Sequence, residues 1–137
     1  MTGLCLVMAG IIRATVPAQE FSLAWTHSVE KVRWEEDYRV EGAALLPVAA
    51  RVHGSGAGME PPAHAVLRDG VWHYRPDGPA LPRLRITLSP YTSDYDLCWN
   101  RQCAKVTELV RLAAPDGVVE ISGCPLATGA SLPPMAK

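Results

Sequence analysis

The chain has almost no excess of charge of either sign, and this balance disfavours several classes of partner. Its 137 residues carry 13 Lys and Arg against 14 Asp and Glu. The sequence shows no basic stripe interleaved with aromatic residues, so nucleic acid is not an expected partner. The same balance disfavours a strongly charged polymer of either sign as a partner.

The sequence also lacks a hydrophobic run long enough to cross a bilayer. The apolar stretch at 4–12 falls well short of the about 20 residues that a spanning helix needs. No positive residue precedes this stretch, although a secretory signal requires one. We therefore predict a buried strand at 4–7, a turn at Ala9 and Gly10 and a second strand at 11–16, with a short signal peptide as the alternative.

Motifs of catalysis and nucleotide binding are missing as well. There is no G-x-S-x-G, so a hydrolase has little support. The glycine-rich segment HGSGAGM has neither the Gly-Lys-Ser/Thr of a P-loop nor the spacing of a dinucleotide fingerprint. Neighbours on a strand point to opposite faces, so His27 and Ser28 do not form part of a triad. We expect a non-enzymatic protein without a cofactor or a bound metal.

What the chain does contain is the pattern of an all-β protein. Strand signals recur between turns rich in its 12 prolines and 11 glycines, and no stretch has a convincing helical period. We predict one domain over residues 1–127, an antiparallel β-sandwich or barrel-like fold of about 9–11 short strands, and a disordered tail at 128–137. The remaining strands are expected at 21–29, 32–41, 44–52, 63–67, 71–75, 84–88 and 118–122, and a hairpin with two cysteines supplies two more. A short helix is expected at 105–112.

Two of the four cysteines stand where they can face each other. Cys98 and Cys103 bracket WNRQ, which reads as a hairpin with Asn100 and Arg101 at its tip. A disulfide between them is geometrically plausible, and a pair of reduced cysteines is the alternative, since disulfides persist only in oxidising compartments. Zinc is disfavoured because the spacing is loose and no second ligand pair follows.

The segment WTHSVEKVRWEEDYRV specifies a polar hairpin. Alternation places Trp25 and His27 on one inward face with Trp34 and Glu36. A turn centred on residues 30–31 sets His27 opposite Trp34 and Trp25 opposite Glu36, so that His27 and Glu36 are diagonal neighbours. Because a buried carboxylate needs a partner, we predict a contact between His27 and Glu36. Fixing the strand register is the favoured role, and a general base, a metal site or a pH switch are the alternatives.

The opposite face of this hairpin carries charges of alternating sign. These residues are Arg33, Glu35, Asp37 and Arg39, and we predict that they form a solvated surface.

The segment RVHGSGAGMEPP follows the next strand. Its three glycines permit positive φ and can gather backbone N–H groups into an anion-binding nest, although a tight turn explains them equally well. Met59 offers an adaptable apolar contact. His53 or Ser55 is a candidate third ligand beside His27 and Glu36.

These two linked motifs, at this spacing, resemble the bacterial family called domain of unknown function 1850. The resemblance extends over nearly all of the chain, including its WHYRP segment. The family has no established activity, but its members are often encoded beside fused membrane subunits of tripartite ATP-independent periplasmic transporters. The resemblance therefore implies an accessory role in solute uptake, a transporter membrane subunit or its solute-binding protein as the partner, and an extracytoplasmic position.

The family signature falls on Trp25 and on most of the residues that we take as candidates for binding a partner or ligand. The candidates are His27, Ser28, Glu30, Trp34, Glu36, Gly54, Ser55, Gly56, Gly58 and Met59. The first hypothesis is a non-enzymatic accessory domain of the transporter. The alternative is a β-domain that binds a small carboxylate, another anion or a metal with the His27 and Glu36 end and the 54–59 loop.

Overall fold

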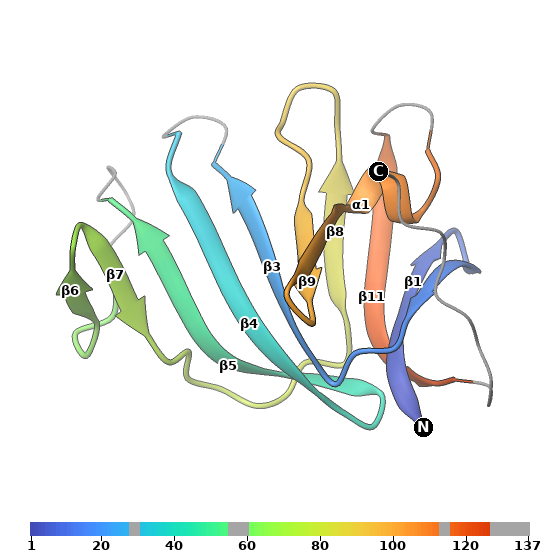
Figure 1. The fold of residues 1–137 in the computed structure, drawn as a ribbon, viewed down its shortest axis with the longest axis horizontal. Coiled ribbons are helices and arrows are strands. Elements are labelled where there is room, and N and C mark those ends of the chain that lie inside the picture. Colours follow the sequence, from blue (N-terminus) through green and yellow to red (C-terminus); the bar gives the residue numbers. More distant parts are fainter. Residues whose placement is uncertain (28–30, 55–60, 113–115, 127–137) are drawn as a thin grey trace.

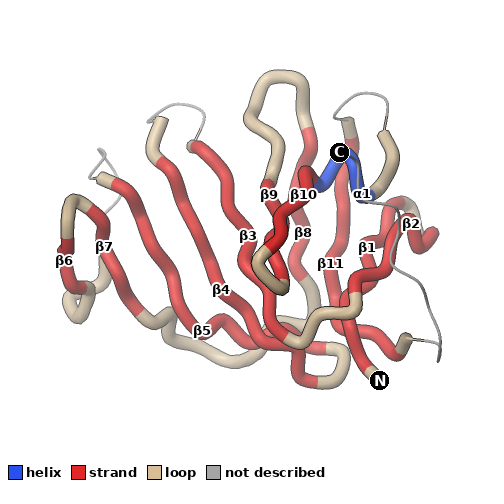
Figure 2. Tube along the Cα trace, viewed as in Figure 1, coloured by secondary structure: helices blue, strands red, loops and turns tan. Residues whose placement is uncertain are grey.

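Two antiparallel β-sheets make up the fold. The computed structural model describes residues 1–27, 31–54, 61–112 and 116–126, which form eleven strands and one short helix (Figures 1 and 2). The predicted all-β, sandwich-like fold is confirmed, and the predicted tail at 128–137 lies outside the described residues. Within those residues no helix is both long enough and apolar enough to cross a bilayer.

The smaller sheet, hereafter the small sheet, has four strands. In spatial order they are β2 (Ile11–Val16), β1 (Thr2–Met8), β11 (Gly117–Pro125) and β8 (Leu84–Leu88). The predicted N-terminal hairpin is confirmed, with Ala9 and Gly10 both at positive φ in its turn. Strand β1 pairs with β11, so the first and last described strands are neighbours (Figure 1).

The larger sheet, hereafter the large sheet, has seven strands. In spatial order they are β10 (Gln102–Lys105), β9 (Asp96–Trp99), β3 (Glu20–Thr26), β4 (Arg33–Glu41), β5 (Ala44–His53), β7 (Val71–Tyr74) and β6 (Val66–Arg68). The helix α1 (Val106–Leu109) follows β10 and is shorter than predicted. The strand expected at 63–67 begins later because the N–H of Ala65 donates to the carbonyl of Pro62 and closes a turn there.

The core lies between the small sheet and the part of the large sheet around β9, β3 and β4. Along the strands that border the core, alternate side chains point into it, as the period of two requires. Its fully buried side chains are Leu4, Leu6, Val16, Leu45, Leu97, Val106, Val110, Val119 and Ile121. No side chain of β6 or β7 belongs to this cluster, and these two strands extend the large sheet beyond it (Figure 1).

The two sheets also meet backbone to backbone at Gly123. Its N–H donates to the carbonyl oxygen of Ala43, in the turn between β4 and β5, over 2.9 Å. A Cβ at this position would collide with the carbonyl oxygen of Gly42. Glycine is therefore required at Gly123 by the close approach of the two sheets.

The cysteine hairpin forms as predicted and is bridged. Cys98 and Cys103 are directly opposite each other on β9 and β10, with Cα atoms 4.0 Å apart. Asn100 and Arg101 form the tip, both at positive φ, which suits the tight primed turn of a two-residue hairpin.

A second disulfide links the two central strands of the small sheet. Cys5 on β1 is bonded to Cys124 on β11, across 119 positions of the chain. All four cysteines are thus paired, and the reduced alternative for the hairpin cysteines does not hold in this structure.

Candidate functional site

The register of the β3–β4 hairpin decides which motif residues meet. Trp25 lies opposite Trp34 and Leu23 lies opposite Glu36. The pair that closes the hairpin is His27 and Val32, joined by a 2.9 Å hydrogen bond from the N–H of His27. The predicted register was therefore wrong by two residues, because the pairing is symmetric about 29–30 and not about 30–31. A shift of two preserves parity, so the predicted faces are confirmed.

The predicted contact between His27 and Glu36 was wrong for the same reason. In the true register Glu36 is four positions away from the residue opposite His27, too far for a diagonal contact. The half-buried Glu36 carboxylate instead accepts a hydrogen bond from the hydroxyl of Tyr38. Burial and this hydrogen bond raise the pKa of Tyr38 far above its usual range. The inward carboxylate thus found its partner two residues along its own strand.

Aromatic rings surround this carboxylate on the inner face of the large sheet. Trp25 stacks on Trp34 at 6.1 Å and meets Tyr95 at 5.6 Å. Burial, and then the charge of Glu36, raise the pKa values of Tyr74 and Tyr95. Trp34, predicted as a binding residue, is placed in this packed layer, where its indole Nε1 is buried and has no partner among the described residues.

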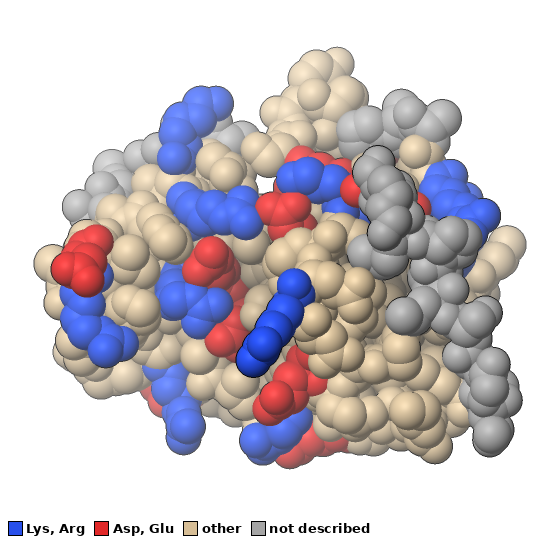
Figure 3. All heavy atoms as spheres, in the orientation of Figure 1, with Lys and Arg blue, Asp and Glu red and all other residues tan. Residues whose placement is uncertain are grey.

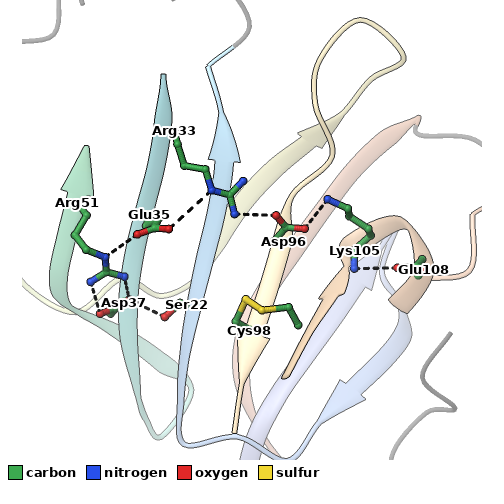
Figure 4. The surroundings of a disulfide bond; sticks show 10 residues. Ser22, Arg33, Glu35, Asp37, Arg51, Asp96, Cys98, Lys105 and Glu108 are labelled. Carbon is green, nitrogen blue, oxygen red and sulfur yellow. Dashed lines mark hydrogen bonds and ion pairs between the residues drawn. A yellow bond between two sulfur atoms is a disulfide. The ribbon is translucent and has the colours of Figure 1, made fainter. Parts of the chain in front are cut away.

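The outer face of the large sheet carries a continuous ion-pair network, which Figure 4 shows around the Cys98 disulfide. Asp96 on β9 contacts Arg33 at 2.9 Å and Lys105 at 2.6 Å. Arg33 continues to Glu35 at 3.8 Å, and Glu35 to Arg51 at 2.8 Å. Acidic and basic side chains accordingly alternate over these strands in the space-filling view (Figure 3).

Arg51 is the best-anchored member of the network. Its guanidinium donates to both carboxylate oxygens of Asp37, at 2.7 and 2.9 Å, while the hydroxyl of Ser22 donates to Asp37 over 2.6 Å. The side chains of Arg51 and Asp37 are 26% and 29% exposed. The prediction of a merely solvated charged surface was therefore wrong for Arg33, Glu35 and Asp37, which are half-buried in ordered pairs.

These contacts set the protonation of the carboxylates. Burial raises the pKa of Glu35, but hydrogen bonds from Arg51 and His53 outweigh it and the net pKa is lowered. Hydrogen bonding to Arg51 lowers the pKa of Asp37 against the effect of burial. Asp96 also has a lowered pKa, because Lys105 and Arg33 together outweigh its burial. All three are held as carboxylates at neutral pH.

The candidate metal set does not assemble among the described residues. His53 lies on the outer face, with its Nε2 3.3 Å from Glu35, whereas Glu36 points to the inner face. The proposed convergence of His27, Glu36 and His53 was therefore wrong. Within the described ranges, no group of three His, Cys, Asp or Glu side chains could hold a metal ion.

The glycine-rich segment is described only at its first glycine. Gly54 has a φ of 100°, and its N–H donates to the carbonyl of Gly70 over 2.9 Å. Strand β5 is thereby tied at its end to the β6–β7 turn. Six candidate residues lie outside the described residues: Ser28, Glu30, Ser55, Gly56, Gly58 and Met59.

Sequence reasoning missed the partners that the network recruits from distant strands. Arg51, Asp96 and Lys105 were not singled out, although each stands on the polar side of a strand that alternates. The pairing of β3 with β9 that brings Asp96 beside the hairpin joins residues 72 to 76 positions apart, such as Ala24 with Asp96 and Ser22 with Cys98, and leaves no local signal.

The geometry defines a disulfide-bonded β-sandwich whose large sheet has an aromatic inner face and an ion-paired outer face. The chain belongs to the family described as Domain of unknown function (DUF1850), whose model matches residues 21–106. That match contains both motifs from which the resemblance was drawn. No curated protein and no solved structure matches the chain.

Proposed function

We propose that this domain is a non-enzymatic accessory protein that binds a subunit of a tripartite ATP-independent periplasmic transporter. The observation that carries the proposal is the convergence of both family motifs at one end of the large sheet. His27 directly follows β3, next to the start of β4. Trp34 on β4 pairs with Val52, so His53 and Gly54 follow beside Arg33. A partner seated there contacts both motifs at once.

The state of the carboxylates supports a binding role over catalysis. A general base works best when its pKa lies near the working pH. The pKa values of Glu35, Asp37 and Asp96 are shifted the other way, by ion pairs that also fix their positions. These side chains therefore serve to hold the outer face of the large sheet in a fixed arrangement.

The two disulfides support a position outside the cytoplasm. Disulfides persist in oxidising compartments such as the periplasm and are rare where thiols are kept reduced. Cys5 with Cys124 and Cys98 with Cys103 leave no free thiol among the described residues. This compartment is where a transporter of this kind presents its solute-binding protein and the outer surface of its membrane subunit.

Site-specific photo-crosslinking tests the proposal. A benzophenone amino acid replaces His53, whose side chain is 42% exposed, and the protein is co-expressed with the membrane subunit and the solute-binding protein of the transporter. A matched probe replaces Arg13, an exposed residue on β2 of the small sheet. We expect an adduct with one transporter subunit from position 53 and none from position 13. No adduct from position 53, or equal adducts from both positions, would overturn the proposal.

A further inference from the structure

A hollow of about 490 Å³ lies on the outer face of the large sheet, over β5, β7 and β6. The register places Arg51, His73 and Val66 side by side on this face, because Arg51 pairs with His73 and His73 pairs with Val66. Alternation along β6 adds Arg68 to the same face. The small side chain of Ala49 leaves room between these longer side chains.

The hollow has uncompensated positive charge. Its lining includes three arginines and no acidic residue. Arg51 is neutralised by Asp37 and Glu35 from outside the lining. Arg68 and Arg75, however, are exposed and form no ion pair with any residue that the structure describes. A ligand that brings carboxylates would therefore be attracted to the hollow.

The hollow borders an open strand edge. Among the residues that the structure describes, β6 is the last strand of the large sheet, and its Val66 and Leu67 are 54% and 52% exposed. Its turn to β7 is the two-residue turn of Asp69 and Gly70, both at positive φ. In such a hairpin the residues flanking the turn form a hydrogen-bonded pair and the next pair does not. Leu67 therefore directs its N–H and C=O to the open edge.

We propose that an extended acidic segment of a partner protein adds to the large sheet along β6. Its backbone would pair with Leu67, its carboxylates would point to the outer face toward Arg68 and the hollow, and its alternate apolar side chains would cover the exposed side chain of Leu67. This is strand addition, in which main-chain hydrogen bonds give affinity and alternating side chains give specificity. The surface lies beside the His53 end of the sheet, since Val71 pairs with both His53 and Arg68, but the pairing along the outer edge of β6 does not depend on the transporter contact.

The shape of the site selects this occupant. The hollow is open along the sheet face, whereas small-molecule sites enclose most of their ligand. On β6, Arg68 faces the hollow and the exposed Leu67 faces the opposite side of the sheet, which matches a strand that alternates acidic and apolar residues. With one short strand for pairing, the interaction is expected to be transient.

Peptide titration followed by backbone amide NMR tests the inference. The probe is the peptide acetyl-Val-Glu-Val-Glu-Val-amide. One control has lysine in place of glutamate, and the other has the same composition with the valines and the glutamates grouped instead of alternating. We expect the alternating acidic peptide alone to shift the amide signals of Leu67 and Arg68. Equal shifts with all three peptides, or shifts at β6 with none of them, would overturn the proposal.

Charge reversal sharpens the test. The double variant Arg68→Glu, Arg75→Glu should bind the acidic peptide at least about tenfold more weakly and should gain binding to the lysine peptide. Arg13→Glu, on the far strand β2, should change neither. Leu67→Pro removes the outward N–H without breaking a bond to β7, and it should abolish the shift of the Arg68 amide while the protein stays folded. If the reversal leaves peptide selectivity unchanged, or if succinate reproduces the shifts at Leu67, the proposal fails.

Discussion

The two sheets of this protein are stabilised in different ways. The small sheet has a buried apolar face and a long-range disulfide, and between its strands it carries one ion pair, Arg85 with Glu120, among the described residues. The large sheet adds a network that runs from Lys105 across to Arg51. The family match at 21–106 reaches every strand of the large sheet but only β8 of the small sheet. The difference indicates that the features common to the family lie mainly in the large sheet.

The largest expected effect separates the two disulfides. In the chain-entropy description a disulfide restricts the unfolded chain more when it closes a longer loop. The bond of Cys5 with Cys124 spans 119 positions and that of Cys98 with Cys103 spans 5. Replacing the first pair by alanine should cost about 5 kcal/mol of unfolding free energy, and replacing the second about 2 kcal/mol. Urea unfolding of both double variants measures these two losses. Equal losses would contradict a larger contribution to stability from the disulfide in the small sheet.

A smaller effect separates the ion pairs of the two sheets. Arg51→Met keeps much of the apolar stem but leaves the half-buried carboxylates of Glu35 and Asp37 without their main partner, and should cost about 2 kcal/mol. Arg85→Met removes a pair in which the arginine is 67% exposed, and should cost less than about 0.5 kcal/mol. Thermal unfolding of the two variants compares them. A similar loss in both would show that the network adds nothing to ordinary surface pairing.

The smallest effect is a change in the dependence of stability on pH. The pKa values of Glu35 and Asp37 lie below their ordinary values of 4.5 and 3.8, so on acidification the unfolded chain takes up protons before the folded protein does. The stabilisation is complete above those values and is lost as the pH falls through the folded pKa values. Arg51→Met should lose stability less steeply in acid than the wild type, as urea midpoints across the acid range would reveal. Parallel curves would refute the role of Arg51.

Local patterns were sufficient to predict most strands. Alternation in β8 and β3, the glycine turns and the residues flanking Asn100 and Arg101 are short-range signals, and the corresponding strands and hairpins are confirmed. The register of the β3–β4 hairpin was missed because it depends on how the connection closes, which the strand residues do not encode. The predicted face of each side chain was nevertheless correct, because side chains on a strand alternate with a period of two and the register shifted by two.

Long-range partners could not be predicted in the same way. Cys5 meets Cys124 because β1 pairs with β11, and Asp96 meets Arg33 because β3 pairs with both β9 and β4. The β1–β11 and β3–β9 pairings join segments that have no local relation. The alternating pattern correctly predicted that the Glu36 carboxylate faces inward and needs a partner, but it indicated His27 as that partner and not Tyr38. A phenol on the same strand satisfies the carboxylate without a second charge.

The disulfide in the small sheet also determines how the molecule responds to mechanical force. Met1 and Leu126 lie side by side, because the N–H of Leu126 donates to the carbonyl of Met1, and Cys5 and Cys124 follow immediately inward. A pull applied to these two ends would peel a few residues and then load the sulfur–sulfur bond directly. All of the chain between the two cysteines, including the whole large sheet, is shielded from stretching while that bond is intact.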